Sequence, residues 1–217
     1  MTMTPRRTVA AGGVTALVAV GLFVVIAAAV HSGSALTLWD QRVADALHRN
    51  VGPPWTDLLA AVSALHAPRA MLALTAVAAL PLLARRDTAG LLMLLASVIG
   101  GSSLNHLVKH SFQRAQPNLE GALVTATDFS FPSGHVASAT LLYGAAVALI
   151  MFATRRRRIR LAAGASAAAL VALVALSRVA LGKHYLSDVV AAAAFGVAWL
   201  ALCGTVLALY RQRRLAR

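Results

Sequence analysis

Residues 161–177 have the sequence LAAGASAAALVALVALS, residues 178–184 have RVALGKH, and residues 185–210 have YLSDVVAAAAFGVAWLALCGTVLALY. The first and third stretches are almost wholly apolar, whereas the short stretch between them contains an arginine, a lysine and a histidine. A helix needs about 20 mainly apolar residues to cross a bilayer. The pattern therefore predicts two consecutive membrane-spanning helices with a polar connection at one face of the membrane.

The composition extends this prediction to the whole chain. Of the 217 residues, 59% are hydrophobic and only 12% are charged, and the mean hydropathy is +0.73. A soluble domain of this size carries about 25% charged residues. We therefore expect an all-α, polytopic membrane protein with a single domain over residues 1–217. The lone Cys203 lies inside an apolar run, so neither a disulfide nor a thiolate metal site is expected.

Six membrane-spanning helices are expected, with two shorter helices after the first. Leu36–Asn50 is predicted to be an interfacial helix, with Trp39, Val43, Ala46 and Leu47 on its apolar face. A short helix is predicted over residues 55–66. The first span is longer than the apolar core of a signal peptide, about 7–15 residues, so we interpret it as an uncleaved span. The expected spans are residues 8–30, 67–84, 88–110, 133 to just before 155, 161–177 and 185–210.

Basic residues lie at the ends of alternate apolar segments. They form the lead at residues 6–7, the pair 85–86, the cluster 155–160 and the tail 211–217. By the positive-inside rule, this side of the membrane is the cytoplasm. The longest polar connection, residues 111–131, then lies on the periplasmic or exterior side. A net charge of +13 distributed in this way argues against a nucleic-acid partner.

The segment Ser177–Asp188 carries candidate functional side chains. If a helix begins at Tyr185, His184 and Asp188 are four residues apart and lie on one face. A carboxylate in that position holds one imidazole nitrogen and leaves the other free and basic. Arg178 offers a planar set of donors that suits a phosphate. The segment therefore predicts a nucleophile, an orienting carboxylate and an anion-binding group.

Two further segments lie on the same predicted side. Pro132-Ser133-Gly134-His135 predicts a helix N-terminus, whose backbone N–H groups and dipole favour an anion. Gly134 lets a ligand approach the backbone closely, and His135 is placed to protonate a leaving oxygen. Lys109 begins a third segment that ends at Pro117. Ionisable residues at membrane depth are costly and usually functional.

In this order, the three segments resemble the signature of the type 2 phosphatidic acid phosphatase superfamily. That signature is Lys-x6-Arg-Pro, then Pro-Ser-Gly-His, then Ser-Arg-x5-His-x3-Asp. The second and third parts match in full. The first departs from the family pattern, because Gln116 stands where the family usually has Arg. The resemblance runs from about Lys109 to Asp188.

The resemblance implies a metal-independent lipid phosphatase without a cofactor. It makes His184 a nucleophile that becomes a phosphohistidine, held by Asp188. His135 protonates the departing lipid oxygen and then activates water. The residues that bind the phosphate are Lys109, Ser133, Gly134 and Arg178. Gln116 stands where the family has a phosphate-binding Arg. Either Arg114, two residues upstream, replaces that Arg, or Gln116 itself donates one neutral hydrogen bond to the phosphate.

Each motif alone has a simpler explanation. Pro-Ser-Gly-His alone can be a helix cap, His184 and Asp188 a structural i,i+4 pair, and Arg178 an anchor for lipid headgroups. Their joint occurrence, in order and on one side of the membrane, favours a functional site. The alternatives are a lipid-phosphate binding or transport protein without catalysis and an enzyme similar to vanadate-dependent haloperoxidases, although six spans argue against the latter.

The motifs specify the phosphate and not the lipid that carries it. Candidate substrates within the family are a polyprenyl diphosphate such as undecaprenyl diphosphate, phosphatidic acid, phosphatidylglycerol phosphate and a lipid A phosphate. The abundance of alanine and arginine is typical of a GC-rich bacterial genome, which places the protein in a bacterial plasma (inner) membrane. Small residues on several spans permit helix association within or between chains and leave the oligomeric state open.

Overall fold

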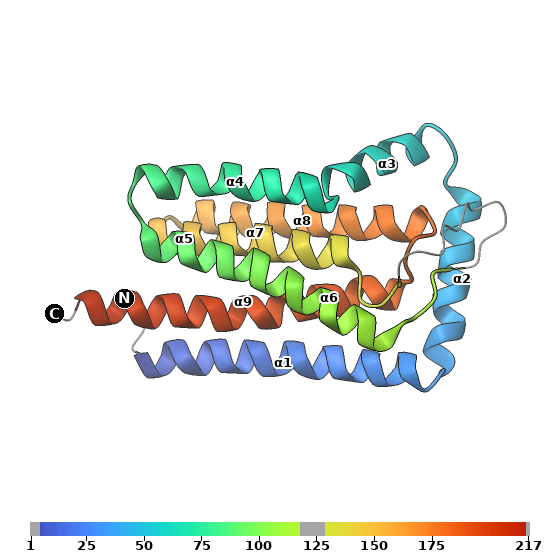
Figure 1. Cartoon of the computed structure of the whole chain (residues 1–217), viewed down its shortest axis with the longest axis horizontal. Helices are drawn as coiled ribbons and strands as arrows, with labels where there is room; N and C mark the ends of the chain where they lie inside the picture. Colours follow the sequence, from blue (N-terminus) through green and yellow to red (C-terminus); the bar gives the residue numbers. More distant parts are fainter. Residues whose placement is uncertain (1–4, 118–128, 216–217) are drawn as a thin grey trace.

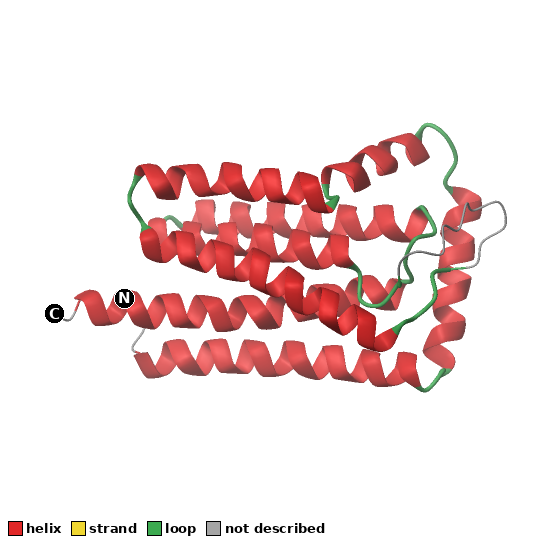
Figure 2. Ribbon diagram, viewed as in Figure 1, coloured by secondary structure: helices red, strands yellow, loops and turns green. Residues whose placement is uncertain are grey.

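The computed structural model describes residues 5–117 and 129–215. Within these ranges the ordered elements are helices joined by short loops, as Figure 2 shows. The part of the long polar connection that carries Glu120 and Asp128 lies outside the described residues. The helices are α1 (Pro5–His31), α2 (Ala35–Asn50), α3 (Trp55–Leu65), α4 (Pro68–Ala84), α5 (Thr88–Leu95), a π-helical turn (Ala96–Gly100), α6 (Gly101–Phe112), α7 (Gly134–Ala153), α8 (Arg157–Ala180) and α9 (Leu186–Leu215).

The all-α, polytopic fold predicted from the sequence is confirmed. In the described part of the chain, five helical segments are long and apolar enough to cross a membrane: 6–31, 88–112, 134–153, 157–180 and 186–214. A sixth span requires α3 and α4 together, since they meet at a bend of 59°. Pro68 begins α4, where its missing N–H costs nothing. The helices expected over residues 55–66 and 67–84 are both present, and together they form the bent sixth span.

The span over residues 88–112 is continuous but irregular in the middle. Residues 96–100 form a π-helical turn between α5 and α6. Such a turn leaves backbone groups without their usual partners. The indole Nε1 of Trp199 in α9 donates to the carbonyl oxygen of Ala96 at 3.0 Å. A side chain from a neighbouring span therefore stabilises the irregular turn.

The long helices form a bundle whose two ends differ in chemistry. The described ends of the chain, the α4–α5 turn and the α7–α8 turn lie at the left of Figure 1. These segments carry the basic clusters, including Arg85, Arg86 and residues 155–160. The α6 C-terminus, the α7 N-terminus and the α8–α9 connection lie toward the other end. The structure thus separates the basic clusters from the three motif segments.

Helix α2 lies across the end of the bundle, roughly perpendicular to the spans, as expected of an interfacial helix (Figure 1). Of the predicted apolar face, Val43 and Leu47 do face the core, whereas Trp39 and Ala46 are exposed. Asp40 and Ala44 are buried, and Val43 and Leu47 pack against the core, a spacing of three and four residues. Trp39 is 62% exposed. Asp40 replaces Trp39 on the inward face because it pairs with a distant arginine, described below.

Helix α7 is the centre of the bundle and packs against α8 and α9 on one side and α6 on the other. Small residues allow this close packing. A side chain at Gly196 in α9 would approach Thr140 of α7 to 2.7 Å, and one at Gly101 would approach Leu141 to the same distance. Both distances are too short for a real carbon contact. The glycines therefore bring α6 and α9 close enough to α7 to place their outer ends together.

Candidate functional site

The α8–α9 connection is shaped by a glycine-capped helix end. The Arg178 carbonyl accepts hydrogen bonds from the N–H groups of Lys183 at 3.0 Å and His184 at 3.2 Å. Gly182 has a φ of +66°, in the left-handed region, and its N–H donates to the Val179 carbonyl at 3.0 Å. These are the bonds of a Schellman cap, which favours glycine at this position. The cap folds His184 back toward Arg178.

His184 is 2% exposed, and a backbone group determines its tautomer. Its Nδ1 lies 2.7 Å from the carbonyl oxygen of Ser130. A carbonyl only accepts, so Nδ1 carries the proton and Nε2 keeps a free lone pair. The nearest carboxylate oxygen of Asp188 is 3.7 Å from Nδ1, too long for a hydrogen bond. Helix α9 begins at Leu186, after His184, so the helical stacking expected from the sequence is absent.

Asp188 instead forms an ion pair with Arg114. Its two carboxylate oxygens accept from Arg114 at 2.6 Å and from the N–H of Tyr185 at 2.8 Å. Arg114 also donates to Asp40 at 2.8 Å and to the Ser187 hydroxyl at 2.8 Å. Its guanidinium lies 4.1 Å from the centre of the Tyr185 ring. The structure therefore places Arg114 between two buried carboxylates.

Asp40 joins the interfacial helix to this network. It accepts from the Ser187 N–H at 2.9 Å, and the Ser187 hydroxyl donates to its other oxygen. Together with Asp188, it supplies carboxylate acceptors at the start of α9, where an anion is favourable. The backbone of Arg114 contributes as well, because its carbonyl accepts from Ser130 N–H at 2.7 Å. The carbonyl of Ser130, in turn, accepts the hydrogen bond from His184 Nδ1.

The N-terminus of α7 is arranged differently from that of α9. Ser133 precedes the helix in an extended conformation, and its side chain forms no cap bond. Its hydroxyl oxygen is fully buried and has no hydrogen-bond partner among the described residues. The N–H of Ser133 donates to the backbone carbonyl of Asp188 at 3.2 Å, which fixes the start of α7 beside α9. This helix terminus therefore keeps the capacity to bind an anion.

Cationic side chains converge on this terminus. Lys109, in the last turn of α6, is 6% exposed. Arg178 donates to the Ser63 hydroxyl of α3 at 2.6 Å. Both cations, and His184, are close enough to His135 to act on it electrostatically. Residues from α6, α7, α8 and the α8–α9 connection thus lie near one another, and their positive charges could neutralise those of a bound phosphate.

Burial and nearby charges together shift the pKa values of His184 and Arg114. Burial lowers the pKa of His184, and the positive charges of Arg178 and Lys109 act in the same direction, against the raising effect of Asp188. His184 is therefore held neutral. Burial also tends to lower the pKa of Arg114, but Asp188 and Asp40 outweigh it and raise that pKa overall.

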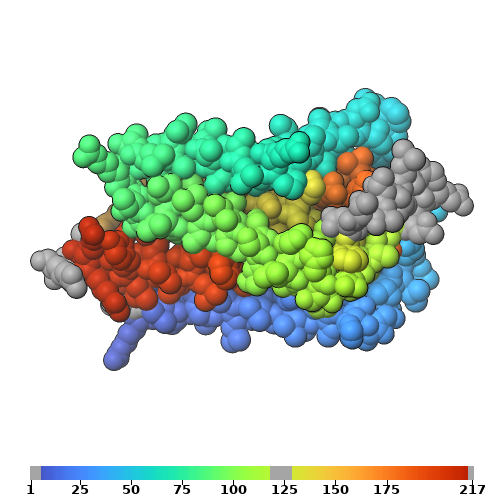
Figure 3. Space-filling model, in the orientation of Figure 1, coloured from blue at the N-terminus to red at the C-terminus, as the bar shows by residue number. Residues whose placement is uncertain are grey.

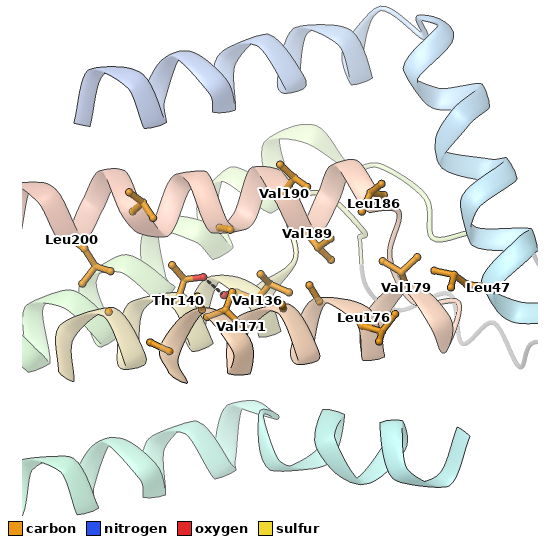
Figure 4. Close-up of a pocket in the computed structure, with 17 residues that line it drawn as sticks. Leu47, Val136, Thr140, Val171, Leu176, Val179, Leu186, Val189, Val190 and Leu200 are labelled. Carbon is orange, nitrogen blue, oxygen red and sulfur yellow. Dashed lines mark hydrogen bonds between the residues drawn. The ribbon is translucent and has the colours of Figure 1, made fainter. Parts of the chain in front are cut away.

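Two hollows flank α7. A cavity of about 510 Å³ is bounded by α4, α6 and α7, and its lining includes Lys109, Gly134 and His135. An apolar groove of about 600 Å³ lies on the side of α8 and α9, with Leu47 at one end and Leu200 at the other (Figure 4). Thr140 in this groove already donates to the Val136 carbonyl. Of the two hollows, only the α4–α6–α7 cavity has candidate site residues (Lys109, Gly134 and His135) in its described lining.

Sequence reasoning missed several residues of the site. Asp40 and Ser130 were not singled out, because one looked like part of a polar helix face and the other acts through its backbone. His66 is buried at the α3–α4 bend. Its Nδ1 donates to the Val62 carbonyl at 2.8 Å and its Nε2 accepts from the Tyr143 hydroxyl at 2.7 Å. No group of three or more His, Cys, Asp or Glu side chains in the described ranges is arranged to bind a metal.

Comparison with known proteins adds independent information. The family model described as the PAP2 superfamily matches residues 90–212. Phosphatidylglycerophosphatase B of Bacillus subtilis (strain 168) is 30% identical over 183 residues, which cover 81% of this chain and 86% of the relative.

Two solved structures share the fold. The first transmembrane PAP2 type phosphatidylglycerolphosphate phosphatase from Bacillus subtilis has a TM-score of 0.77 and 24% identity, covering 87% of this chain and 94% of that one. Aquifex aeolicus LpxE has a TM-score of 0.57 and 19% identity, covering 79% and 95%. Given a family match over more than half of its length and a relative aligned over most of it, the chain belongs to the PAP2 superfamily.

Proposed function

We propose that the chain is a membrane lipid phosphatase that removes a phosphate through a covalent intermediate on His184. The observation that supports this most directly is the bond from His184 Nδ1 to the Ser130 carbonyl. It leaves Nε2 unprotonated and therefore nucleophilic. Membership of the PAP2 superfamily and the converging cations support the same conclusion.

In the first step, His184 Nε2 attacks phosphorus, the N–P bond forms, and the bond to the lipid oxygen breaks. His135 donates a proton to that oxygen. In the second step, His135 takes a proton from water, which attacks phosphorus and releases phosphate and free His184. Lys109, Arg178, the Ser133 hydroxyl and the α7 N-terminus at Gly134 neutralise the charge on the phosphate oxygens.

Phosphatidylglycerol phosphate is the first substrate to test. The curated relative and the more similar solved structure are both named for that activity. Phosphatidic acid, undecaprenyl diphosphate and a lipid A phosphate complete the panel. We expect phosphate release from at least one of these lipids in detergent by the wild-type protein and none by a variant without His184. Equal release by both proteins would exclude the proposed mechanism.

The distribution of basic residues supports a site on the periplasmic or exterior side of a bacterial plasma membrane. Basic clusters gather at the end of the bundle opposite the site (Figure 1). A lipid of the outer leaflet would then present its phosphate at the level of Lys109 and His135. The same topology argues against the soluble, haloperoxidase-like alternative. A binding or transport protein without catalysis differs by releasing no phosphate.

The pH dependence of the reaction follows from the environment of His184. The nucleophile must be neutral, and its pKa lies below its ordinary value of about 6.5. We therefore expect the acid limb of kcat/KM to have its midpoint below about pH 6.5, with activity lost as the pH falls through it. Initial rates over a pH series measure this midpoint. A midpoint above about 6.5 would mean that His184 is not held neutral.

Gln116 offers a test of the departure from the family pattern. It is partly buried beside the buried Pro117. If the position faces the phosphate, Gln116→Arg replaces a neutral contact with a charge-assisted one and should lower KM for a phosphate monoester lipid about fivefold. Steady-state kinetics at constant ionic strength measure the effect, with Gln113→Arg, at an exposed position, as control. An unchanged or raised KM would contradict a phosphate contact at this position.

A further inference from the structure

The cavity beside His135 has two chemically different walls. Helix α4 and the π-helical turn contribute apolar side chains, including Met71, Leu72 and Ile99. The opposite wall comes from α6 and α7 and carries polar side chains below the catalytic histidine. Figure 3 shows atoms of α7 between α4 and α6 on the face in view. The cavity is therefore suited to a molecule that is polar on one side and apolar on the other.

The polar wall is a stripe along α6 that ends at Lys109. Ser102, Asn105 and Lys109 are spaced three and four residues apart, so they lie on one face of the helix. Across the cavity, Ser138 follows His135 by one turn of α7. The hydroxyl oxygens of Ser102 and Ser138 are 3.3 Å apart, and Ser138 donates to the Gly134 carbonyl at 2.9 Å. These polar groups continue the phosphate site toward the middle of the bilayer.

Asn105 is the informative member of this stripe. Its side chain is 3% exposed, and its amide oxygen has no hydrogen-bond partner in the described structure. A buried polar atom without a partner is unfavourable, and more so at membrane depth. Because it lines the cavity, a ligand there can supply the missing donor. The amide oxygen therefore indicates that part of the substrate carries a hydrogen-bond donor at this level.

The position of Asn105 relative to the phosphate defines which part of the substrate it would contact. Four residues of helix separate it from Lys109, a rise of about 6 Å. His135 must reach the leaving oxygen, so the leaving group passes His135 into the same cavity. The atoms next to that oxygen are then at the level of Asn105. Asn105 would contact the leaving alcohol, and not the phosphate.

The chemistry of the wall selects among the candidate leaving groups. Lys109 is the only lysine or arginine among the described residues that line the cavity, so a second phosphate, as in a diphosphate, would lack counter-charges below the first. The diacylglycerol of phosphatidic acid has no hydroxyl to offer. A glycerol linker has one, which donates to an amide oxygen and accepts from a serine hydroxyl.

We propose that Asn105, together with Ser102, forms a subsite for a hydroxyl group on the leaving alcohol. The subsite gives the enzyme a preference for phosphate esters of a polyol headgroup, such as the glycerol phosphate of phosphatidylglycerol phosphate. The inference rests on the proposed function, because it takes the phosphate to be bound at His184 and His135. It adds the residue that distinguishes one phosphate lipid from another.

The test compares Asn105→Ala with the wild type on phosphatidylglycerol phosphate and on phosphatidic acid with the same acyl chains. For phosphatidylglycerol phosphate, kcat/KM should fall about 10- to 100-fold, as expected for a lost buried hydrogen bond. For phosphatidic acid, it should change less than about twofold. Asn50→Ala is the matched control, since Asn50 is exposed on α2, and it should change neither value.

An equal fall on both lipids, or no fall on phosphatidylglycerol phosphate, would overturn the subsite. If Asn105→Ala does not fold, Asn105→Ser and Ser102→Ala decide by the same ratio of the two kcat/KM values. A wild type that hydrolyses phosphatidic acid or a diphosphate but not phosphatidylglycerol phosphate would exclude the subsite and leave the proposed function intact. A wild type that releases no phosphate from any lipid would exclude both.

Discussion

A His184→Ala variant should lose turnover of every lipid that the wild type hydrolyses. Removal of the nucleophile from a covalent mechanism lowers kcat by about 10⁴- to 10⁶-fold. The effect should be at the upper end here, because a backbone carbonyl holds Nδ1 of His184 and so orients its Nε2, the attacking atom. Phosphate release over time, at matched protein concentration in detergent, measures the loss.

His31→Ala is the matched control, because His31 is exposed at the end of α1. It should retain wild-type turnover. The His184→Ala variant should keep its thermal unfolding temperature within a few degrees and should still bind the lipid. Phosphatase activity that survives in a folded His184→Ala protein would mean that another residue attacks phosphorus.

Replacement of Arg114 should lower kcat on the order of 10²-fold while KM changes little. The guanidinium holds Asp188, Asp40 and Ser187 in place, and displacement of a catalytic group by about 1 Å has an effect of that size. Arg114→Lys keeps the charge but cannot bridge both carboxylates with a planar fork. Arg114→Ala leaves two buried carboxylates unpaired and should destabilise the fold by about 3–5 kcal/mol.

This result distinguishes the phosphate contact that the sequence predicted for Arg114 from the positioning role that its hydrogen bonds indicate. If Arg114 contacted the phosphate, its replacement would mainly raise KM. If it positions Asp188 and Ser130, kcat falls and the acid limb of the pH profile shifts, because the environment of His184 changes. Asp40→Asn tests the positioning role independently, since a carboxylate does not bind phosphate. Asp40→Asn should therefore lower kcat, as Arg114→Lys does.

The double variant Asp40→Asn/Arg114→Lys should lose less than the sum of the two single effects, since both act through one network. Asp57→Asn, at an exposed position in the first turn of α3, is the matched control and should leave kcat unchanged. Additive effects on kcat, or a large rise in KM for Arg114→Lys, would contradict the positioning role.

Much of the fold could be predicted from local patterns. The apolar runs and basic clusters predicted the spans and the separation of the two ends. The order of the motifs predicted that Lys109, His135 and Arg178 would meet, and the structure brings them together with His184. The span expected over residues 67–84 matches α4 (Pro68–Ala84) closely. These signals are short-range, so they can be read along the chain.

The remaining features depend on pairing between distant residues. Asp40 is buried because Arg114, 74 positions later, pairs with it, and no periodicity on α2 indicates such a partner. The orienting acceptor of His184 is a backbone carbonyl, which any residue at position 130 provides. Asn105 belongs to no sequence motif, and its place in the cavity one turn below Lys109 depends on how α6 packs against α4 and α7.

The most direct measurement is to locate the phosphoryl group on the trapped enzyme. The His135→Ala variant should be mixed with an activated aryl phosphate, whose leaving group needs no proton, quenched at alkaline pH, digested and analysed by mass spectrometry. Without His135 to activate water, the intermediate should accumulate with its phosphoryl group on His184. A phosphoryl group on another residue, or turnover without any phosphoenzyme, would contradict the account.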